Sequence, residues 1–385
     1  MAYTARMRTG RVVAFIFPLS ILAVSSSPLA QQAVPADVVV RAIEPPANPL
    51  PPESASVAVR KFSFIAYGDT RGPADGVIVQ PQHSAVMDTM LRAIATERAA
   101  GFPLRFVIQS GDAVTNGRSA AQWNSSFTPI IERLTRGAGL PYFFAVGNHD
   151  VGGRPAGDPD REAGLKNAKA AMSNLWPPEG SVRRLDGYPT FAFGFGQMLF
   201  ITFDSNIPED PVQLAWVSGQ LEKLDRRRFP FVVAFFHHPP ITSGPHGGAA
   251  VERESAAVRR LYLPLFRKYH VRMTITGHDH LYDHFVERYD DAQGTHRMDH
   301  IVSGGGGAPI YAYRGEPDLA LFVAAAAPQH VVVEHLARPG PDEADNPHHF
   351  VIFQVDGDRI WERTVATVAR PFMPLGQARV ELVDR

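Results

Sequence analysis

From about residue 60 onward, short apolar runs alternate along the chain with longer segments in which apolar residues recur at a helical spacing. The apolar runs end on polar residues and predict buried strands at 61–69, 104–112, 141–150, 197–205, 229–240 and 271–280. The segments between them predict helices at 84–101, 119–137, 212–227 and 252–269. Near-continuous apolar strands separated by amphipathic helices are typical of a largely parallel sheet covered by helices.

The C-terminal part has a different pattern, which predicts a β-hairpin. Two apolar runs at 348–355 and 358–365 flank Asp356-Gly357, a dipeptide that favours tight hairpin turns. Two other segments, 152–188 and 305–347, are rich in Gly, Pro and Ala. These two segments are predicted to be long surface excursions around a site.

The N-terminal residues predict a signal peptide over 1–30. Three arginines, the last of them Arg11, precede a 13-residue apolar run at 12–24. A helix that spans a bilayer needs about 20 apolar residues, whereas this run has the length of a signal-peptide core and leads into small residues up to Ala30. The alternative is an uncleaved membrane anchor. Cleavage after Ala30 would leave an exported chain, periplasmic or extracellular, without a stable membrane span.

Residues 31–59 are rich in proline and show little periodicity. This composition predicts an extended, disordered leader that takes no part in the core. The folded domain is therefore predicted at 60–385, which is long enough to bury a large hydrophobic core.

Composition excludes several classes of protein. The chain has no cysteine, so disulfides, thiolate nucleophiles and iron–sulfur clusters are excluded, and a metal must be held by nitrogen and oxygen ligands. The formal net charge is −1, which gives no sign of a nucleic-acid-binding surface. The stretch around Ser303 lacks the leading glycine of the serine-hydrolase motif G-x-S-x-G.

Five of the predicted strands end on polar side chains of the types that bind metals. They occur in the order GD, GD, GNHD, HHPP and GHDH, and their candidate ligands are Asp69, Asp112, Asn148, His237, His278 and His280. In open α/β sheets, ligands bind in the crevice at the carboxyl ends of the strands. Each motif alone is explained by a turn or a helix cap, but all five at successive strand ends predict one metal site.

This order of motifs resembles the calcineurin-like metallophosphoesterases, the superfamily that includes purple acid phosphatases, protein Ser/Thr phosphatases and several phosphodiesterases. The resemblance covers about residues 61–366, and the stretches FFHHPPITSGPHGG and GHDHLYDHF look most like the purple acid phosphatase branch. It implies a four-layer α/β/β/α sandwich with two central mixed sheets. It also implies hydrolysis of a small phosphate ester, and the acid-phosphatase-like stretches favour a phosphomonoester. The alternatives are a phosphodiester or nucleotide substrate, or a non-catalytic relative that binds metal or phosphate.

The resemblance further implies two divalent metal ions (Zn, Mn or Fe) with a bridging water as nucleophile. Its implied ligands are the bridging Asp112, then Asp69 and His280 on the first metal, and Asn148, His237 and His278 on the second. His149 matches the family's catalytic histidine, which protonates the leaving alkoxide; the alternative is a histidine that only steadies the metal. His238, Asp150 and Asp204 are interpreted as structural.

Two positions depart from the family pattern. Many relatives have a histidine ligand where this chain has Arg71, and an arginine stays protonated and cannot bind a metal. Purple acid phosphatases instead use a tyrosine where this chain has Thr115. The first metal is therefore one protein ligand short, and water, Asn116 or His83 would complete the shell, or that metal binds weakly.

Arg71 and His246 are the candidate substrate-binding residues. A guanidinium can grip a phosphate through two parallel hydrogen bonds and neutralise charge in the transition state. The alternative for Arg71 is a salt bridge to a loop carboxylate. His246, in the stretch SGPHGG, matches a histidine that some acid phosphatases place near the substrate.

The absence of the tyrosine ligand leads to a testable prediction. Without a phenolate, a ferric ion is poorly favoured, so the metals should be divalent and the colour of the purple enzymes should be absent. We expect the purified, metal-loaded protein to show no strong absorption band in the visible range. A strong visible band would overturn the assignment of divalent metals.

Overall fold

The computed structural model describes residues 39–152, 155–247, 251–316, 322, 330–368 and 380–382. The chain divides into two compact units, 1–37 and 38–385, and all described residues lie in the second. The predicted signal peptide falls outside the described residues. In the part of the chain that the structure describes, none of the helices is both long and apolar enough to cross a membrane.

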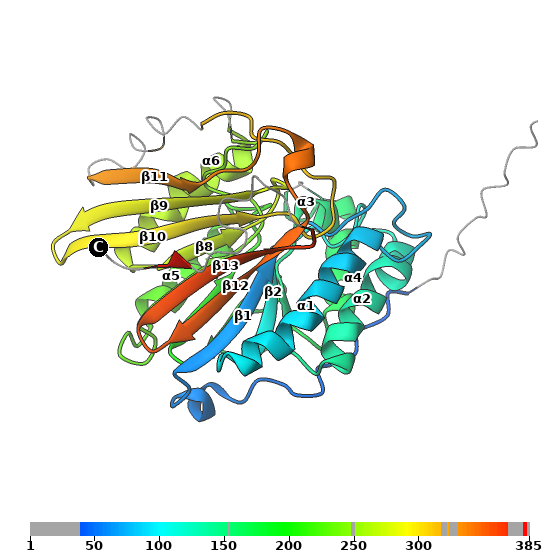
Figure 1. Ribbon diagram of the computed structural model, residues 1–385, viewed down its shortest axis with the longest axis horizontal. Coiled ribbons are helices and arrows are strands. Elements are labelled where there is room, and N and C mark those ends of the chain that lie inside the picture. The colour runs from blue at the N-terminus through cyan, green and yellow to red at the C-terminus, as the bar shows by residue number, and fades with distance from the viewer. Residues whose placement is uncertain are drawn as a thin grey trace, which may run out of the picture. The chain divides into compact units, whose positions relative to one another are not determined.

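The first of two mixed sheets has six strands and contains the first and the last strand of the domain, β1 and β14 (Figure 1). Its strands are, in spatial order, β14 (Val380–Glu381), β13 (Arg359–Ala366), β12 (His349–Asp356), β1 (Lys61–Tyr67), β2 (Leu104–Gln109) and β3 (Tyr142–Phe144). Strands β1, β2 and β3 are parallel, and β12 is antiparallel to β1. The hairpin β12–β13 confirms the predicted one. Its two-residue loop is Gly357–Asp358, one residue later than predicted, and Gly357 has φ 63°.

The second sheet has eight strands. In spatial order they are β11 (Val331–Ala337), β9 (Tyr282–Asp291), β10 (Gly294–Ser303), β8 (Met273–Thr276), β7 (Phe231–Phe235), β6 (Met198–Thr202), β5 (Thr190–Phe195) and β4 (Arg184–Leu185). Strands β6, β7, β8 and β10 run parallel, whereas β9 and β11 pair antiparallel. The carboxyl ends of β7 and β8 thus lie side by side.

Phenylalanine rings fill the space between the two sheets. Phe64 of β1 and Phe106 of β2 each place their ring centroid 5.0 Å from that of Phe200 of β6, edge to face. Phe143 of β3 stacks on Phe193 of β5 at 3.7 Å. Edge-to-face and stacked aromatic pairs stabilise a core beyond the area that they bury. This layer of rings holds the two sheets face to face.

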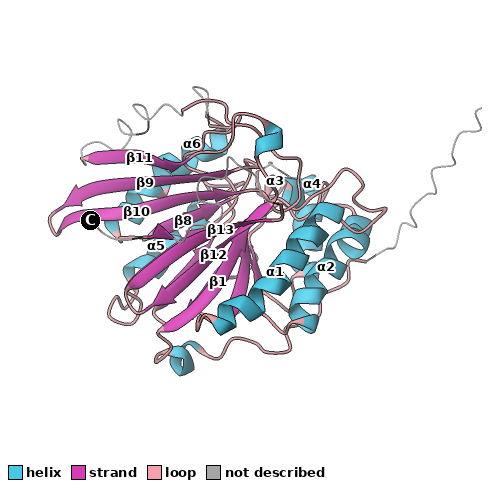
Figure 2. Cartoon of the chain, viewed as in Figure 1, coloured by secondary structure: helices cyan, strands magenta, loops and turns pink. Residues whose placement is uncertain are grey.

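Helices cover the outer face of each sheet, as Figure 2 shows, which confirms the predicted layered α/β fold. On the first sheet lie α1 (Pro81–Ala99), α2 (Thr128–Glu132) and α4 (Pro159–Ala171), and on the second lie α5 (Pro211–Glu222), α6 (Arg253–Leu261) and α7 (Leu263–Lys268). The short α3 (Asn148–Val151) follows β3. π-Helical turns at Gln122–Phe127 and Arg133–Gly137 flank α2. Short 3-10 turns occur at Glu53–Ser56 and Glu343–Asp345.

Two predicted loop regions contain regular elements. Segment 152–188 includes α4 and β4, and segment 305–347 includes β11. The pattern also failed to predict β9 and β10, because buried charged residues such as Asp283 and Glu287 interrupt their apolar alternation. These charges are paired inside the fold; the Glu287 carboxylate accepts from Arg267 Nε at 2.5 Å. Pairing offsets the free-energy cost of burying these charged side chains. Their presence, however, masks the strand in a hydrophobicity pattern.

The prediction of a disordered leader over 31–59 is wrong for residues 39–59. Ile43 is fully buried in the main core, and its backbone N–H donates to Ala171 O of α4 at 2.9 Å. The backbone N–H of Arg41 donates to Asn124 Oδ1 at 2.8 Å. A segment whose one regular element is the 3-10 turn Glu53–Ser56 therefore packs against the rest of the domain through buried side chains such as Ile43.

We expect Ile43→Ala to lower the free energy of unfolding by about 2–5 kcal/mol, because it leaves a cavity in the core. Val39→Ala is the matched control, since this side chain is 81% exposed and its loss should change stability by less than about 0.5 kcal/mol. Urea denaturation followed by circular dichroism measures both variants. Equal stabilities would show that the segment is not part of the core.

Candidate metal centre

The predicted ligands project from the carboxyl ends of neighbouring parallel strands. Asp69 follows β1, Asp112 follows β2, and His278 follows β8. All three have positive φ (59°, 55° and 70°), and among the described residues only four that are not glycine do. A left-handed conformation at such a residue costs about 1–3 kcal/mol and persists only where the surroundings impose it. Backbone strain is thus concentrated at the predicted centre.

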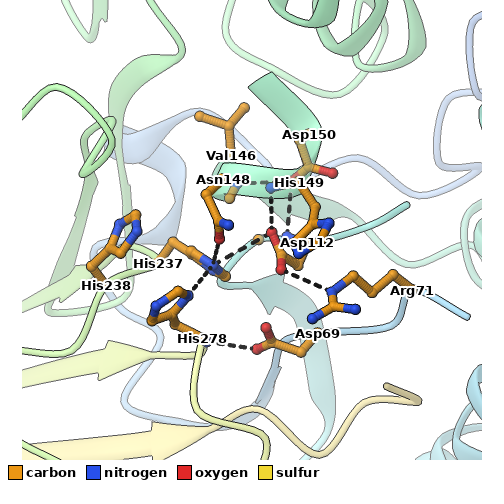
Figure 3. A network of polar contacts seen from close by, with 12 residues as sticks. Asp69, Arg71, Asp112, Val146, Asn148, His149, Asp150, His237, His238 and His278 are labelled. Carbon is orange, nitrogen blue, oxygen red and sulfur yellow. Dashed lines mark hydrogen bonds and ion pairs between the residues drawn. The ribbon is translucent and has the colours of Figure 1, made fainter. Parts of the chain in front are cut away.

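Asn148, His278 and one oxygen of Asp112 converge on the Nε2 atom of His237 (Figure 3). His237 Nδ1–H donates to Ser110 O at 2.9 Å, so its Nε2 carries a lone pair. That Nε2 atom lies 2.9 Å from Asn148 Oδ1, 3.1 Å from His278 Nδ1 and 3.4 Å from Asp112 Oδ1.

The other ring nitrogen of His278 is also occupied. His278 Nε2–H donates to Glu252 Oε2 at 2.7 Å, which leaves a lone pair on Nδ1 of the neutral ring. Lone-pair atoms of Asp112, Asn148 and His278 therefore lie within 3.4 Å of the lone pair on His237 Nε2. Ligand atoms at about 2.1 Å from a tetrahedral ion are about 3.4 Å apart, so this geometry fits a divalent cation.

Burial keeps the ring of His237 ready to bind. Desolvation lowers the pKa of His237 to about 4, against the charge of Asp112, so the ring is neutral at neutral pH. Asp112 is itself buried, which raises its pKa, but His237 and His149 in their protonated forms, together with the charge of Arg71, hold that pKa well below its usual range. A deprotonated carboxylate and neutral imidazoles are the forms that bind metals.

The second group of ligand atoms comes from Asp69, His280 and the carboxylate of Asp112. One ligand atom from each lies within 4.8 Å of the others. Asp69 Oδ1 is buried and accepts no hydrogen bond, and it lies 3.6 Å from His280 Nε2. Burial, together with the charge of Asp112, raises the pKa of Asp69. A buried carboxylate oxygen without a donor fits a cation here.

Arg71 lies against this second group of ligands. Its Nε–H donates to Asp112 Oδ2 at 3.2 Å, and its Nη2 donates to His280 Nε2 at 3.3 Å. The predicted salt bridge to a carboxylate is therefore present, and the partner is the predicted bridging ligand. The grip of Arg71 on a phosphate stays a prediction.

His149 stands beside Asp112 with a defined tautomer. Its backbone N–H donates to Asp112 Oδ1 at 3.0 Å, and its Nδ1–H donates to Thr115 O at 2.8 Å. The second ring nitrogen, Nε2, is left to hold or release a proton. Thr115, Asn148 and His149 line a hollow of about 380 Å³.

Asp150 holds the two ligand loops together and is structural, as interpreted from the sequence. Its carboxylate accepts from the backbone N–H groups of Asp112 (2.8 Å), Ala113 (2.9 Å) and Gly147 (2.7 Å). Position 147 must be glycine, because a Cβ atom there would lie 2.2 Å from Asp112 Oδ1.

Neither side chain proposed to complete the first metal shell does so here. His83 is fully buried, and its two ring nitrogens contact Gln80 Oε1 (2.9 Å) and Tyr67 OH (3.1 Å). Asn116 Oδ1 accepts from the backbone N–H of Arg118 at 3.2 Å. Thr115 Oγ1 donates to Gly72 O at 2.9 Å. Of the alternatives, water and weak binding remain.

His246 lies at the edge of the centre. Its ring centroid is 4.2 Å from that of His278, and its Nδ1–H donates to Asp279 Oδ1 at 2.6 Å. This places His246 next to the predicted second metal, and its contact with substrate stays a prediction. His238 and Asp204 pair with Ser205 and Arg161, in agreement with structural roles.

Sequence reasoning missed Glu252 and Tyr311. Glu252 precedes α6 and fixes the tautomer of His278. Tyr311 stacks on the ring of His280 with centroids 4.2 Å apart, and burial raises the pKa of its phenol. Glu252 lies at the start of a predicted helix and Tyr311 in a predicted surface excursion, and neither was singled out as a candidate site residue.

The comparison with protein families identifies the family of the chain. The calcineurin-like phosphoesterase model matches residues 64–282, more than half of the chain. The chain therefore belongs to the calcineurin-like phosphoesterase family, a family of metal-dependent phosphoester hydrolases. The matched residues include all six predicted ligands and His149.

The curated relatives are plant purple acid phosphatases that match over part of the chain. The chain is 35% identical over 80 residues to probable purple acid phosphatase 20 of Arabidopsis thaliana, covering 20% of this chain and 18% of that protein. It is 25% identical over 186 residues to purple acid phosphatase 21 of the same plant, covering 48% and 40%. The chain thus spans less than half the length of either relative.

A solved structure shares the fold. The purple acid phosphatase PPD1 from yellow lupin (Lupinus luteus) seeds superposes with a TM-score of 0.56 and 16% sequence identity. The superposition covers 83% of this chain and 53% of the lupin chain. At this identity, the likeness concerns the fold alone.

Proposed function

We propose that this chain is an exported phosphoric ester hydrolase that acts on phosphomonoesters with two divalent metal ions. One observation carries the proposal: Asn148 Oδ1, His278 Nδ1 and Asp112 Oδ1 gather around His237 Nε2, with His149 beside Asp112. Simple metal storage has no use for a histidine with one defined, free ring nitrogen.

Asp112 supports the proposal of two metal positions. Its Oδ1 faces His237, whereas its Oδ2 is on the side of Arg71. The same carboxylate is grouped with Asp69 and His280. Divalent metals bound here would polarise a phosphoryl oxygen and lower the pKa of a water nucleophile.

His149 supplies the proton for the leaving group in this proposal. Thr115 O accepts from Nδ1–H, so the imidazolium presents its other proton on Nε2. A positioned imidazolium can transfer this proton to the departing alkoxide oxygen. The neighbouring hollow of about 380 Å³ offers room for the leaving group. Arg118 and Asp160 also line it, and they would contact polar leaving groups.

A phosphomonoester is the proposed substrate class, because the named relatives are acid phosphatases. The alternatives are a phosphodiester or nucleotide, since these esters present similar oxygens to the site. A panel of chromogenic monoesters, diesters and nucleotides separates them by kcat/KM. A diester preferred over every monoester would overturn the assignment of substrate class.

We expect His149→Ala to lower kcat on a chromogenic phosphomonoester by about 10²–10⁴-fold, because the leaving group loses its proton donor. The bound metal, measured by elemental analysis, should stay at the wild-type level, since the side chain of His149 is not among the predicted ligands. His330→Ala, an exposed histidine on the far part of the second sheet, is the control and should keep full activity.

Two outcomes would contradict the catalytic role of His149. If the variant loses its metal along with its activity, this residue supports the metal and donates no proton. If the wild type binds metal but hydrolyses no ester of the panel, the chain is a non-catalytic binding protein.

We also propose that the chain is exported, on the signal-peptide features of residues 1–30. In a secreting bacterial host, we expect the mature protein outside the cytoplasm, with a mass that matches a chain beginning at Gln31. A membrane-bound product that retains residues 1–30 would instead support the uncleaved anchor.

A further inference from the structure

We infer that Arg71 competes with the first metal, so that the centre consists of one tight and one weak metal position. This inference rests on the proposed function, because it assumes that the centre binds divalent metals. Below, the tight half comprises Asn148, His237, His278 and Asp112 Oδ1, and the weak half comprises Asp69, His280 and Asp112 Oδ2.

Arg71 uses the lone pairs that a metal in the weak half would need. His280 Nδ1–H donates to Pro309 O at 2.6 Å, so the lone pair of the neutral ring is on Nε2, the atom to which Arg71 Nη2 donates. The Nε–H of Arg71 likewise donates to Asp112 Oδ2. Two of the three protein ligand atoms of the weak half are thus already paired with a cationic side chain.

Arg71 is anchored in this position. Its side chain is only 19% exposed, and its backbone N–H donates to Asp112 O at 3.2 Å. A metal ion that takes the same two lone pairs must displace the guanidinium or lie against it. Two like charges a few ångströms apart in a partly buried site repel each other strongly.

The tight half has the opposite electrostatic surroundings. The outer ring nitrogens of His237 and His278 donate to Ser110 O and to the carboxylate of Glu252. A carboxylate that accepts from a metal-binding histidine makes the ring a better ligand and adds negative charge near the metal. The tight half also has four protein ligand atoms, whereas the weak half has three.

The inequality is tested by titrating the metal-free full chain with Zn²⁺ alone, using calorimetry, with elemental analysis after gel filtration. We expect the wild type to bind Zn²⁺ in two steps and to retain about one ion per chain. Arg71→Gln removes the charge while keeping a polar side chain. It should tighten the second step by at least about tenfold, the effect of roughly 1.4 kcal/mol, and retain nearly two ions.

Two further variants make the test specific. Arg71→Lys keeps the charge and should keep the two unequal steps, which shows that a change seen in Arg71→Gln is electrostatic and not a folding defect. Arg359→Ala removes an exposed arginine of β13 whose guanidinium pairs with Glu381. This control should leave both steps unchanged.

Equal, tight binding of two ions by the wild type would overturn the inference, as would an Arg71→Gln titration identical to that of the wild type. The readout does not depend on turnover. An inert protein with two unequal steps would therefore refute the proposed hydrolase and leave the inference standing, whereas an active protein with two equal steps would do the reverse.

Discussion

The buried carboxylate of Asp112 is the interaction on which the rest of the site depends. Its two oxygens face opposite halves of the centre, one toward His237 and the other toward Arg71. An ionised carboxylate in the interior is costly unless cations or hydrogen-bond donors surround it. The backbone N–H of His149 and the nearby positive charges serve this purpose. The predicted ligands, His149 and Arg71 are thus arranged around one negative charge.

The two-sheet scaffold allows this charge to be buried at a defined point. The parallel strands β1 and β2 end together, and the layer of phenylalanine rings packs them against β6, the neighbour of β7 in the second sheet. Asp150 then ties the loop of Asp112 to that of Asn148 through three backbone donors. Residues more than 200 positions apart thereby meet without a long flexible loop, which keeps the ligand atoms in register.

Much of the centre could be predicted because ligands at strand ends combine a hydrophobic pattern with a fixed order of motifs. Asp69, Asn148 and His280 each ended or followed an apolar run. The supporting residues could not be predicted in this way, since Glu252 and Tyr311 act through contacts that only the folded chain creates. The same holds for β9, whose buried charges hide its strand pattern, and for residues 39–59, whose anchoring depends on two isolated apolar side chains, Val40 and Ile43.

The left-handed backbone at Asp69, Asp112 and His278 lowers the stability of the fold, whereas the predicted centre requires these three side chains. Glycine adopts this conformation without the penalty that a side chain brings. Replacing any of the three residues with glycine would therefore relax the backbone while removing a predicted ligand. In a lineage where selection for the chemistry has ceased, substitutions by glycine at these positions would increase stability and would therefore accumulate early. Their persistence in a relative would therefore be a marker of ongoing selection for the metal site, more informative than the conservation of its core.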